Sequence, residues 1–291
     1  MTTSSQHAEI TRAIQAAPLL SPIANQLLQV TAKADHEMKE VIDLVKCDSL
    51  LTARILRVVN SAAMGLVHQI SSVDHAVSYL GERLVVGIAV AECTNEFLGK
   101  PLEGYEGKAG QLWRHELFTA IASRAVARHA RALIPPDLAF TAGLLHDIGK
   151  AILSEFLRGT SREMVAAIVR GDTADYLTGE QERLGLDHAE VGFELARHWK
   201  LPDALAQVIR HHHHPETAEA ELRPLVYAVH LGDILAMMGG QGTGSDSMKY
   251  HLRQDYAEHF TISKDDLALL LLECSEEFRK VEASLASLKE T

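Results

Sequence analysis

Histidine and aspartate residues recur along the second half of this chain in contexts typical of metal ligands. The sequence holds 16 histidines, and the candidate ligands are His115 in LWRHEL, His146 and Asp147 in GLLHDIGK, His188 in LGLDHAEVG, His212 and His213 in IRHHHHP, and Asp233 in VHLGDIL. Imidazole nitrogen and carboxylate oxygen together suit a borderline divalent ion such as Fe(II), Mn, Ni or Zn. Because water bound to such an ion becomes a nucleophile near neutral pH, the pattern indicates metal-assisted chemistry.

The pair His146 and Asp147 ends an apolar run, and its local geometry sets a condition. On a helix the two side chains would lie about 100° apart, so both reach one ion only if that helix faces a cleft. Lys150 follows four residues after His146 and would fall on the same side of the helix. An ammonium group beside a metal is a natural phosphate contact.

Each of these features also has a purely structural interpretation. A buried histidine bonded to a carbonyl is commoner than a metal ligand, and this is the favoured interpretation of His115 or His188 taken singly. The HHHH run could be an exposed helix end, although it is internal and precedes Pro215, so it is no expression tag. Lys150 could be a cation at a helix C-terminus, and Asp233 a cap. The ordered set within about 120 residues, a normal domain size, favours a metal site.

The elements that must position these residues are predicted to be helices throughout. Apolar residues recur with a period near 3.6, as in SLLTARILRVVN, and no convincing alternating strand is present. Helix starts are indicated by Ser21-Pro22 and by Ser263 followed three residues later by Asp266, a capping-box spacing. The sequence therefore predicts an all-α protein.

Two glycine-rich segments divide this helical pattern. GKPLEGYEGKAG at 99–110 cannot continue a helix, which predicts an N-terminal helical subdomain over 1–104 and a second helical subdomain over 105–291. GGQGTGSDS at 239–247 is typical of a mobile loop within the second subdomain.

The C-terminal segment carries a heptad pattern whose positions are Leu267, Leu271, Cys274, Phe278, Val281, Leu285 and Leu288. It could mediate a dimer or pack on its own domain. The second interpretation is favoured, because Ala268, Leu269, Leu270 and Leu272 widen the apolar face beyond a narrow seam. The protein is expected to be a monomer or a homodimer.

Composition excludes several classes of function. The 291 residues are 47% hydrophobic and 23% charged, as in ordinary globular proteins. The net charge of -11 without a basic stripe disfavours nucleic acid as a partner. The longest apolar runs fall short of the roughly 20 residues of a membrane span, and the N-terminus lacks a signal-peptide pattern, so a cytoplasmic protein is expected. Three scattered cysteines indicate neither a disulfide framework nor a thiolate zinc site.

The order His115, His146-Asp147, Asp233 resembles the HD superfamily of metal-dependent phosphohydrolases. HDIGK with the intervening His188 and His212-His213 is similar to its HD-GYP branch. That resemblance implies a two-metal site cleaving phosphodiesters, with His146 and Asp147 binding metal, Asp147 bridging two ions, and Lys150 on phosphate.

A more extensive resemblance is to the HDOD domain, a helical regulatory module of bacterial signalling proteins. It rests on PLLSPIANQLL, LVKCDSLLTARILRVVNSAAMGL, ISSVDHAVSYLGERLV and IRHHHHP, which fall in the family's order from about Ala17 to about Met238. The family implies an N-terminal helical subdomain packed with an HD-like bundle. It includes members that have lost part of the metal set, whereas this chain retains most of it.

The sequence departs from these families at several positions. Asp48-Ser49 stands where HDOD domains usually have Asp-Pro, and His211 replaces an aromatic residue before the paired histidines. No GYP follows His213, and Gln111 occupies the place where the HD-GYP branch often has a carboxylate. A neutral amide there would hold a further cation less well.

Three hypotheses for function follow. The first is a regulatory signal-transduction protein that retains a divalent metal centre and acts on other signalling proteins. The second is a metal-dependent phosphohydrolase acting on a nucleotide or cyclic dinucleotide, with Asp147 and Lys150 in catalytic roles. The third is a receptor that binds a nucleotide or phosphate ligand without turnover. Fe or Mn is the favoured metal, with Zn, Ni or Mg as alternatives, in one or two ions.

Overall fold

The computed structural model describes residues 3–33, 35–61, 64–66, 68–82, 84–89, 99–247 and 250–286. These residues form helices joined by turns, with isolated β-bridges at Leu102–Gly107 and Ala130–Phe260 and no strand of a sheet among them. The all-α prediction is therefore confirmed. None of the described helices is both long and apolar enough to cross a membrane.

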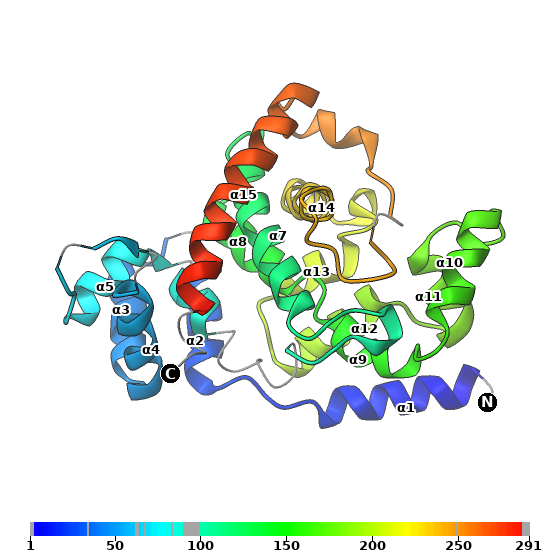
Figure 1. Cartoon of the computed structure of the whole chain (residues 1–291), viewed down its shortest axis with the longest axis horizontal. Helices are drawn as coiled ribbons and strands as arrows, with labels where there is room; N and C mark the ends of the chain where they lie inside the picture. Colours follow the sequence, from blue (N-terminus) through cyan, green and yellow to red (C-terminus); the bar gives the residue numbers. More distant parts are fainter. Residues whose placement is uncertain are drawn as a thin grey trace.

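One group of helices, from the N-terminal third of the chain, lies together at one end of the molecule (Figure 1). It comprises α2 (Pro22–Thr31), α3 (Met38–Lys46), α4 (Ser49–Val59) and α5 (Val73–Leu80). As predicted, α2 starts at Ser21-Pro22, where the Ser21 hydroxyl accepts a hydrogen bond from the Ala24 amide at 3.1 Å. Asp48 caps α4 in the same way, through the amides of Leu50 and Leu51.

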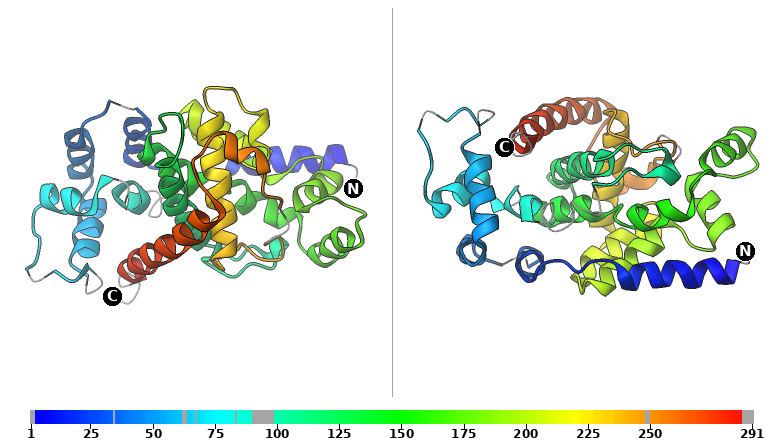
Figure 2. Two further views of the ribbon diagram at one scale, coloured as in Figure 1. Left: turned by 90° about the horizontal axis from the view of Figure 1, so that it is seen from above. Right: turned by 60° about the horizontal axis from the view of Figure 1, so that its bottom comes forward.

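The centre of the molecule is formed by one group of helices, and a second group lies beside it (Figures 1 and 2). The central helices are α7 (Gln111–Ala127), α8 (Pro136–Leu145), α13 (Asp203–His211), α14 (Arg223–Met238) and α15 (Lys264–Ala286). Beside them lie α9 (Gly149–Phe156), α10 (Ser161–Arg170), α11 (Tyr176–Leu184) and α12 (His188–His198), with short 3-10 turns η2 (Glu103–Tyr105), η3 (Pro215–Thr217) and η4 (Gln254–Glu258).

The first helix, α1 (Thr3–Ala16), does not join the N-terminal group but runs along α9, α11 and α12 (Figure 2). The chain then crosses to α2, and this crossing is fixed by hydrogen bonds to the end of α12. The Trp199 indole donates to the Pro18 carbonyl at 2.9 Å, and the Asn25 amide donates to the Trp199 carbonyl at 2.9 Å. The division into 1–104 and 105–291 stays a prediction. The buried side chains of both parts form one continuous core.

Glycines allow the central helices to approach closely enough for their side chains to converge. A Cβ at Gly143 of α8 would lie 2.9 Å from the Ala120 Cα of α7, and one at Gly232 of α14 would lie 2.8 Å from the Ser123 amide nitrogen. Gly149 of α9 likewise meets the His188 carbonyl, which a Cβ would approach to 2.0 Å. Because these contacts leave no space for a larger residue, they fix α7, α8, α9, α12 and α14 against one another.

The C-terminal helix α15 packs on α7 of its own chain through Leu270, Cys274 and Phe278, which are buried. The rings of Phe118 and Phe278 lie 5.4 Å apart. The capping box at its start is present, since the Ser263 amide donates to Asp266 and the Asp266 amide to the Ser263 hydroxyl. Of the predicted heptad positions, the side chain of Leu285 and the whole of Leu288 lie outside the described residues.

The glycine-rich segment at 99–110 is folded rather than extended. It forms η2, closed by the bridge between Leu102 and Gly107, and it buries Tyr105 completely. Gly104 is required there because a Cβ would lie 2.2 Å from the Ser154 carbonyl oxygen of α9. The segment therefore packs on α9 and supplies a tyrosine to the site described next.

Candidate metal centre

Four of the predicted ligands come from three places in the fold and form what we call the first ligand group: His115, His146, Asp147 and Asp233. His115 lies one turn into α7, Asp233 lies within α14, and the other two lie in the turn between α8 and α9. The Nε2 atoms of His115 and His146 are 3.3 and 3.6 Å from Asp147 Oδ2. His115 Nε2 also lies 3.2 Å from Asp233 Oδ1.

The second ligand group consists of His188, His212 and His213. His188 is the first residue of α12, and the two others follow the end of α13. The Nε2 atoms of His188 and His212 lie 3.4 and 3.5 Å from the other oxygen of the same aspartate, Asp147 Oδ1. His213 Nε2 is 2.9 Å from His188 Nε2. Asp147 therefore stands between two groups of imidazoles, one on each carboxylate oxygen.

Hydrogen bonds behind three of these rings determine which nitrogen faces the centre. The Nδ1 atoms of His115, His146 and His212 lie 2.6, 2.8 and 2.8 Å from backbone carbonyl oxygens of Gln241, Gly143 and Ile209. Since a carbonyl oxygen only accepts, each Nδ1 carries a hydrogen, and in the neutral ring Nε2 then presents its lone pair inward. This is the orientation that metal-ligating histidines have.

His188 is oriented by a carboxylate that the sequence did not single out. Glu180 of α11 accepts hydrogen bonds through Oε2 from the His188 Nδ1 at 2.7 Å and from the His188 amide at 2.8 Å. The Tyr105 hydroxyl donates to Glu180 Oε1 at 2.7 Å. All three side chains are fully buried. No local pattern marks Glu180, because its role arises only when α11 packs beside the start of α12.

His230 is a second supporting residue that the sequence analysis missed. It is buried on α14, where its Nδ1 donates to the His212 carbonyl at 2.9 Å and its Nε2 accepts from the Arg253 amide at 3.0 Å. It therefore fixes the backbone of the second ligand group without facing Asp147. The remaining members of the HHHH run, His211 and His214, do not belong to the cluster.

The residues present fit a divalent cation. His212 Nε2, Asp233 Oδ2 and Asp147 Oδ1 are buried and have no hydrogen-bond partner. Leaving such groups unsatisfied is costly, and cation coordination would satisfy them. Two sets with ligand atoms close enough to share an ion are present among the described residues: Asp147, His188, His212, His213 and His115, His146, Asp147.

The electrostatics of the two groups differ. Burial disfavours a charged imidazole, yet hydrogen bonds with Asp147 and Asp233 raise the pKa of His115 to about 10. At His212 of the second group burial dominates and lowers its pKa to about 4, whereas at His188 burial is outweighed by Glu180, which raises the pKa. Despite burial, Lys150 and His146 hold the pKa of Asp147 well below its usual range. The first group thus retains a proton in the absence of a cation, whereas His212 is neutral and available as a ligand.

Lys150 is placed differently from the sequence-based expectation. The chain turns between α8 and α9, so His146 and Lys150 do not lie on one continuous helix, and Lys150 sits in the first turn of α9. Its Nζ lies 2.7 Å from Asp147 Oδ2 and 2.7 Å from Asp246 Oδ2. It also donates to the Thr243 hydroxyl at 3.1 Å. The lysine is therefore beside the centre as expected, but its ammonium group is already paired with carboxylates. Its predicted role on phosphate stays a prediction.

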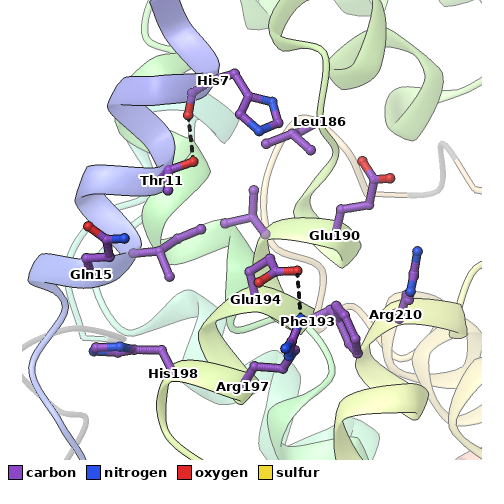
Figure 3. A pocket seen from close by; sticks show the side chains of 12 residues that line it. His7, Thr11, Gln15, Leu186, Glu190, Phe193, Glu194, Arg197, His198 and Arg210 are labelled. Carbon is purple, nitrogen blue, oxygen red and sulfur yellow. Dashed lines mark hydrogen bonds and ion pairs between the residues drawn. The ribbon is translucent and has the colours of Figure 1, made fainter.

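The cluster is enclosed, and none of its seven side chains is more than 8% exposed. Residues 239–247, which we call the cover segment, contribute Gln241, Thr243 and Asp246 to the contacts with His115 and Lys150. An open cavity of about 590 Å³ lies elsewhere, between α1 and α12. Figure 3 shows it lined by exposed charged side chains, including Glu194 and Arg197.

The comparisons with known proteins agree with this architecture. A protein of Treponema pallidum (strain Nichols) without an assigned function is 24% identical over 228 residues, which are 76% of this chain and 42% of that protein. The chain therefore spans less than half the length of this curated relative. A structure from Marinobacter aquaeolei VT8, provisionally named as a signal transduction protein, matches with a TM-score of 0.73 and 19% identity over 98% of this chain and 66% of that one.

A second solved structure, from Shewanella amazonensis SB2B and provisionally named as a phosphohydrolase, matches with a TM-score of 0.59 and 25% identity over 95% of each chain. The family model of the HDOD domain matches residues 17–215, which covers the N-terminal helices, α7 to α13 and most of the histidine cluster. The chain belongs to the HDOD domain family.

Proposed function

We propose that this protein is a regulatory HDOD protein whose HD-type centre binds a divalent metal ion and whose surface relays that state to other signalling proteins. The observation that carries the proposal is the convergence of four imidazoles on the two oxygens of Asp147 within a closed core, with His213 and Asp233 beside them. A site that is enclosed on all sides suits a structural or regulatory ion better than free turnover of large substrates.

The donor set determines which metals fit. Imidazole nitrogen and carboxylate oxygen without thiolate favour Fe or Mn and accept Zn or Ni, whereas Mg prefers oxygen ligands alone. The two ligand groups around Asp147 provide for one or two ions. When bound, such an ion supplies positive charge at the core and a Lewis acid that activates water. The chain's own histidines would hold the ion through Nε2, and Glu180 keeps His188 in the orientation that this requires.

The experiment that tests the proposal is elemental analysis of the protein purified without a nickel column, because the HHHH run could load nickel artificially. One or two equivalents of Fe, Mn or Zn are expected in the parent protein, and none in a His146→Ala, Asp147→Ala double variant. A parent protein that stays free of metal after reconstitution with Fe(II), Mn(II) and Zn(II) would refute the metal centre.

The second candidate function is a phosphohydrolase acting on a nucleotide or cyclic dinucleotide. It is favoured by one specific observation, the carboxylate of Asp147 shared between two ligand groups with the Lys150 ammonium 2.7 Å away. Two ions about 4 Å apart with a cation beside them can clamp a phosphoryl group. The metal-loaded protein should then release product from at least one nucleotide or cyclic dinucleotide, and a flat response over such a panel removes this candidate.

A further inference from the structure

The Asp246 carboxylate is held inside the protein by one ammonium and two hydroxyl donors. Asp246 is fully buried. Its oxygens accept hydrogen bonds from Lys150 Nζ at 2.7 Å, from the Thr243 hydroxyl at 2.8 and 2.9 Å, and from the Tyr250 hydroxyl at 3.0 Å. One ammonium and two hydroxyl groups converging on one point recognise a tetrahedral oxyanion as well as a carboxylate.

This group of donors is continuous with the metal centre. Lys150 Nζ touches Asp147 Oδ2 and Asp246 Oδ2 at the same distance of 2.7 Å, so an anion in the place of Asp246 would lie one lysine away from the shared aspartate. The ring of Tyr250 also stacks on His213 of the second ligand group, with centroids 4.2 Å apart. The donors therefore hold an anion immediately beside the cluster.

The segment that delivers Asp246 is attached mostly through its backbone. The Gln241 and Gly242 carbonyls accept hydrogen bonds from His115 and Gln111, and the Ser245 amide donates to the Tyr105 carbonyl at 2.6 Å. Gly244 adopts a φ of +147°, a conformation that favours glycine, and a Cβ there would lie 2.1 Å from the Tyr105 carbonyl oxygen. The cover segment has no apolar side chain to bury and is fixed by these backbone bonds together with the side-chain anchors at Thr243 and Asp246.

We propose that Lys150, Thr243 and Tyr250 form an anion subsite beside the metal centre, which Asp246 fills as an internal anion until a phosphate group replaces it. The ligand class is a phosphate monoester or diester, an oxyanion that carries at least the single negative charge of the carboxylate that it displaces. Displacement would release the cover segment and open the enclosed cluster, so phosphate binding and access to the metal centre are linked. This proposal names the ligand class of the proposed metal centre. Only the use of the bound phosphate, and not its binding, rests on the proposed function.

The test measures binding of inorganic phosphate to the 291-residue chain treated with chelator, so that neither metal nor turnover enters the result. Asp246→Asn keeps the size of the side chain and removes its charge. We expect this variant to bind phosphate at least tenfold more tightly than the parent protein by calorimetry, because the internal competitor is weakened. Asp265→Asn, an exposed aspartate in the first turn of α15, is the matched control and should bind like the parent. A folded Asp246→Asn protein with parental phosphate affinity overturns the proposal.

A second measurement keeps the test decisive if Asp246→Asn does not fold. Hydrogen exchange of the amides at 241–247 in the parent protein should accelerate when phosphate is added, and should not change with sodium chloride of equal ionic strength. Unchanged exchange at saturating phosphate overturns the proposal.

The two proposals fail separately. Tight phosphate binding by Asp246→Asn in a protein that never retains metal would keep the subsite and remove the metal centre. A metal-loaded protein in which Asp246→Asn leaves phosphate affinity and segment exchange unchanged would keep the centre and remove the subsite.

Discussion

The N-terminal helices α2–α5 and the region around Asp147 use polar side chains in opposite ways. Within α2–α5 the buried side chains are apolar apart from Thr31, and polar groups stand at helix ends, as Asp48 does for α4. Around Asp147, charged and polar side chains fill the core itself. The caps of the first region are bonded within a few residues of the chain, whereas in the second region His212 Nε2 and Asp233 Oδ2 lie in the core without a hydrogen-bond partner. We conclude that only the second region should depend on a bound ligand for its stability.

The largest expected effect is that of metal on unfolding. A ligand that binds only the folded state at 1,000 times its Kd adds about 4 kcal/mol to the free energy of unfolding. The parent protein should show a stabilisation of this order on metal loading, measured by urea unfolding with and without chelator. Asp147→Asn should lose it, because both ligand groups share that carboxylate. Identical unfolding curves for the metal-loaded and metal-free parent protein would show that the region around Asp147 does not depend on a bound ion for its stability.

The next effect concerns the N-terminal helices alone. The Asn60 side chain ends α4 by donating to the Leu56 and Ile70 carbonyls at 2.8 and 2.7 Å and accepting from the Ile70 amide at 2.8 Å. Since each such bond contributes about 1 kcal/mol, Asn60→Ala should lower the free energy of unfolding by about 2 to 3 kcal/mol. Metal content, measured by elemental analysis, should not change. Loss of metal in this variant would show that the two regions are coupled.

Glu180→Gln tests whether the carboxylate that orients His188 contributes to metal affinity. Removing a carboxylate that orients a ligating histidine typically costs about 10- to 100-fold in metal affinity. We expect a loss in this range, measured by competition with a chelator, while the fold remains intact. Glu182→Gln, on the same helix but exposed and bonded to Thr173, is the matched control and should bind metal like the parent. Equal affinities for both variants would mean that Glu180 has only a structural role.

The smallest effect is a pH dependence of stability, which comes from an ion pair between the segment before α3 and the residues after α5. His36 Nε2 pairs with Glu82 Oε2 at 2.7 Å. Burial opposes a charged His36, yet the Lys33 carbonyl and Glu82 outweigh it and raise the pKa of His36 above 6.5. Burial raises the pKa of Glu82 above 4.5. Both groups bind protons more tightly in the folded state, so the stability that they contribute is complete at low pH and falls as pH rises.

His36→Gln tests this sign. Its deficit relative to the parent should be about 1 kcal/mol below pH 6.5, and should shrink as pH rises through the raised pKa of His36. Urea unfolding at several pH values between 5 and 9 measures it. A deficit that grows with pH would contradict the assignment.

Much of the fold could be predicted because its signals are local. The spacing of apolar residues indicates helices, and Ser21-Pro22 and Ser263 with Asp266 begin helices as predicted. The turn between α8 and α9 is not predicted, since the end of the apolar run at His146 is equally compatible with a helix that continues to Lys150. The same limit applies to α1, whose periodicity says that it is a helix but not that it lies on α12.

The candidate ligands could be selected from the sequence because imidazole and carboxylate are the chemistry that a divalent ion needs, and their order along the chain resembled a known family. The residues that orient and enclose these ligands carry no such signal in the sequence. Glu180, His230 and Asp246 act on partners 8, 18 and 96 residues away, and no spacing rule connects residues across such distances.

The helices, the family and the set of metal-type side chains follow from the sequence alone, because they depend on residue type and local period. The packing of the helices places Asp147 between two ligand groups, pairs Lys150 with Asp246 and closes the cluster. These properties cannot be predicted from the sequence, because they depend on which helices approach closely. That approach is set by packing at Gly143, Gly149 and Gly232 rather than by any local preference.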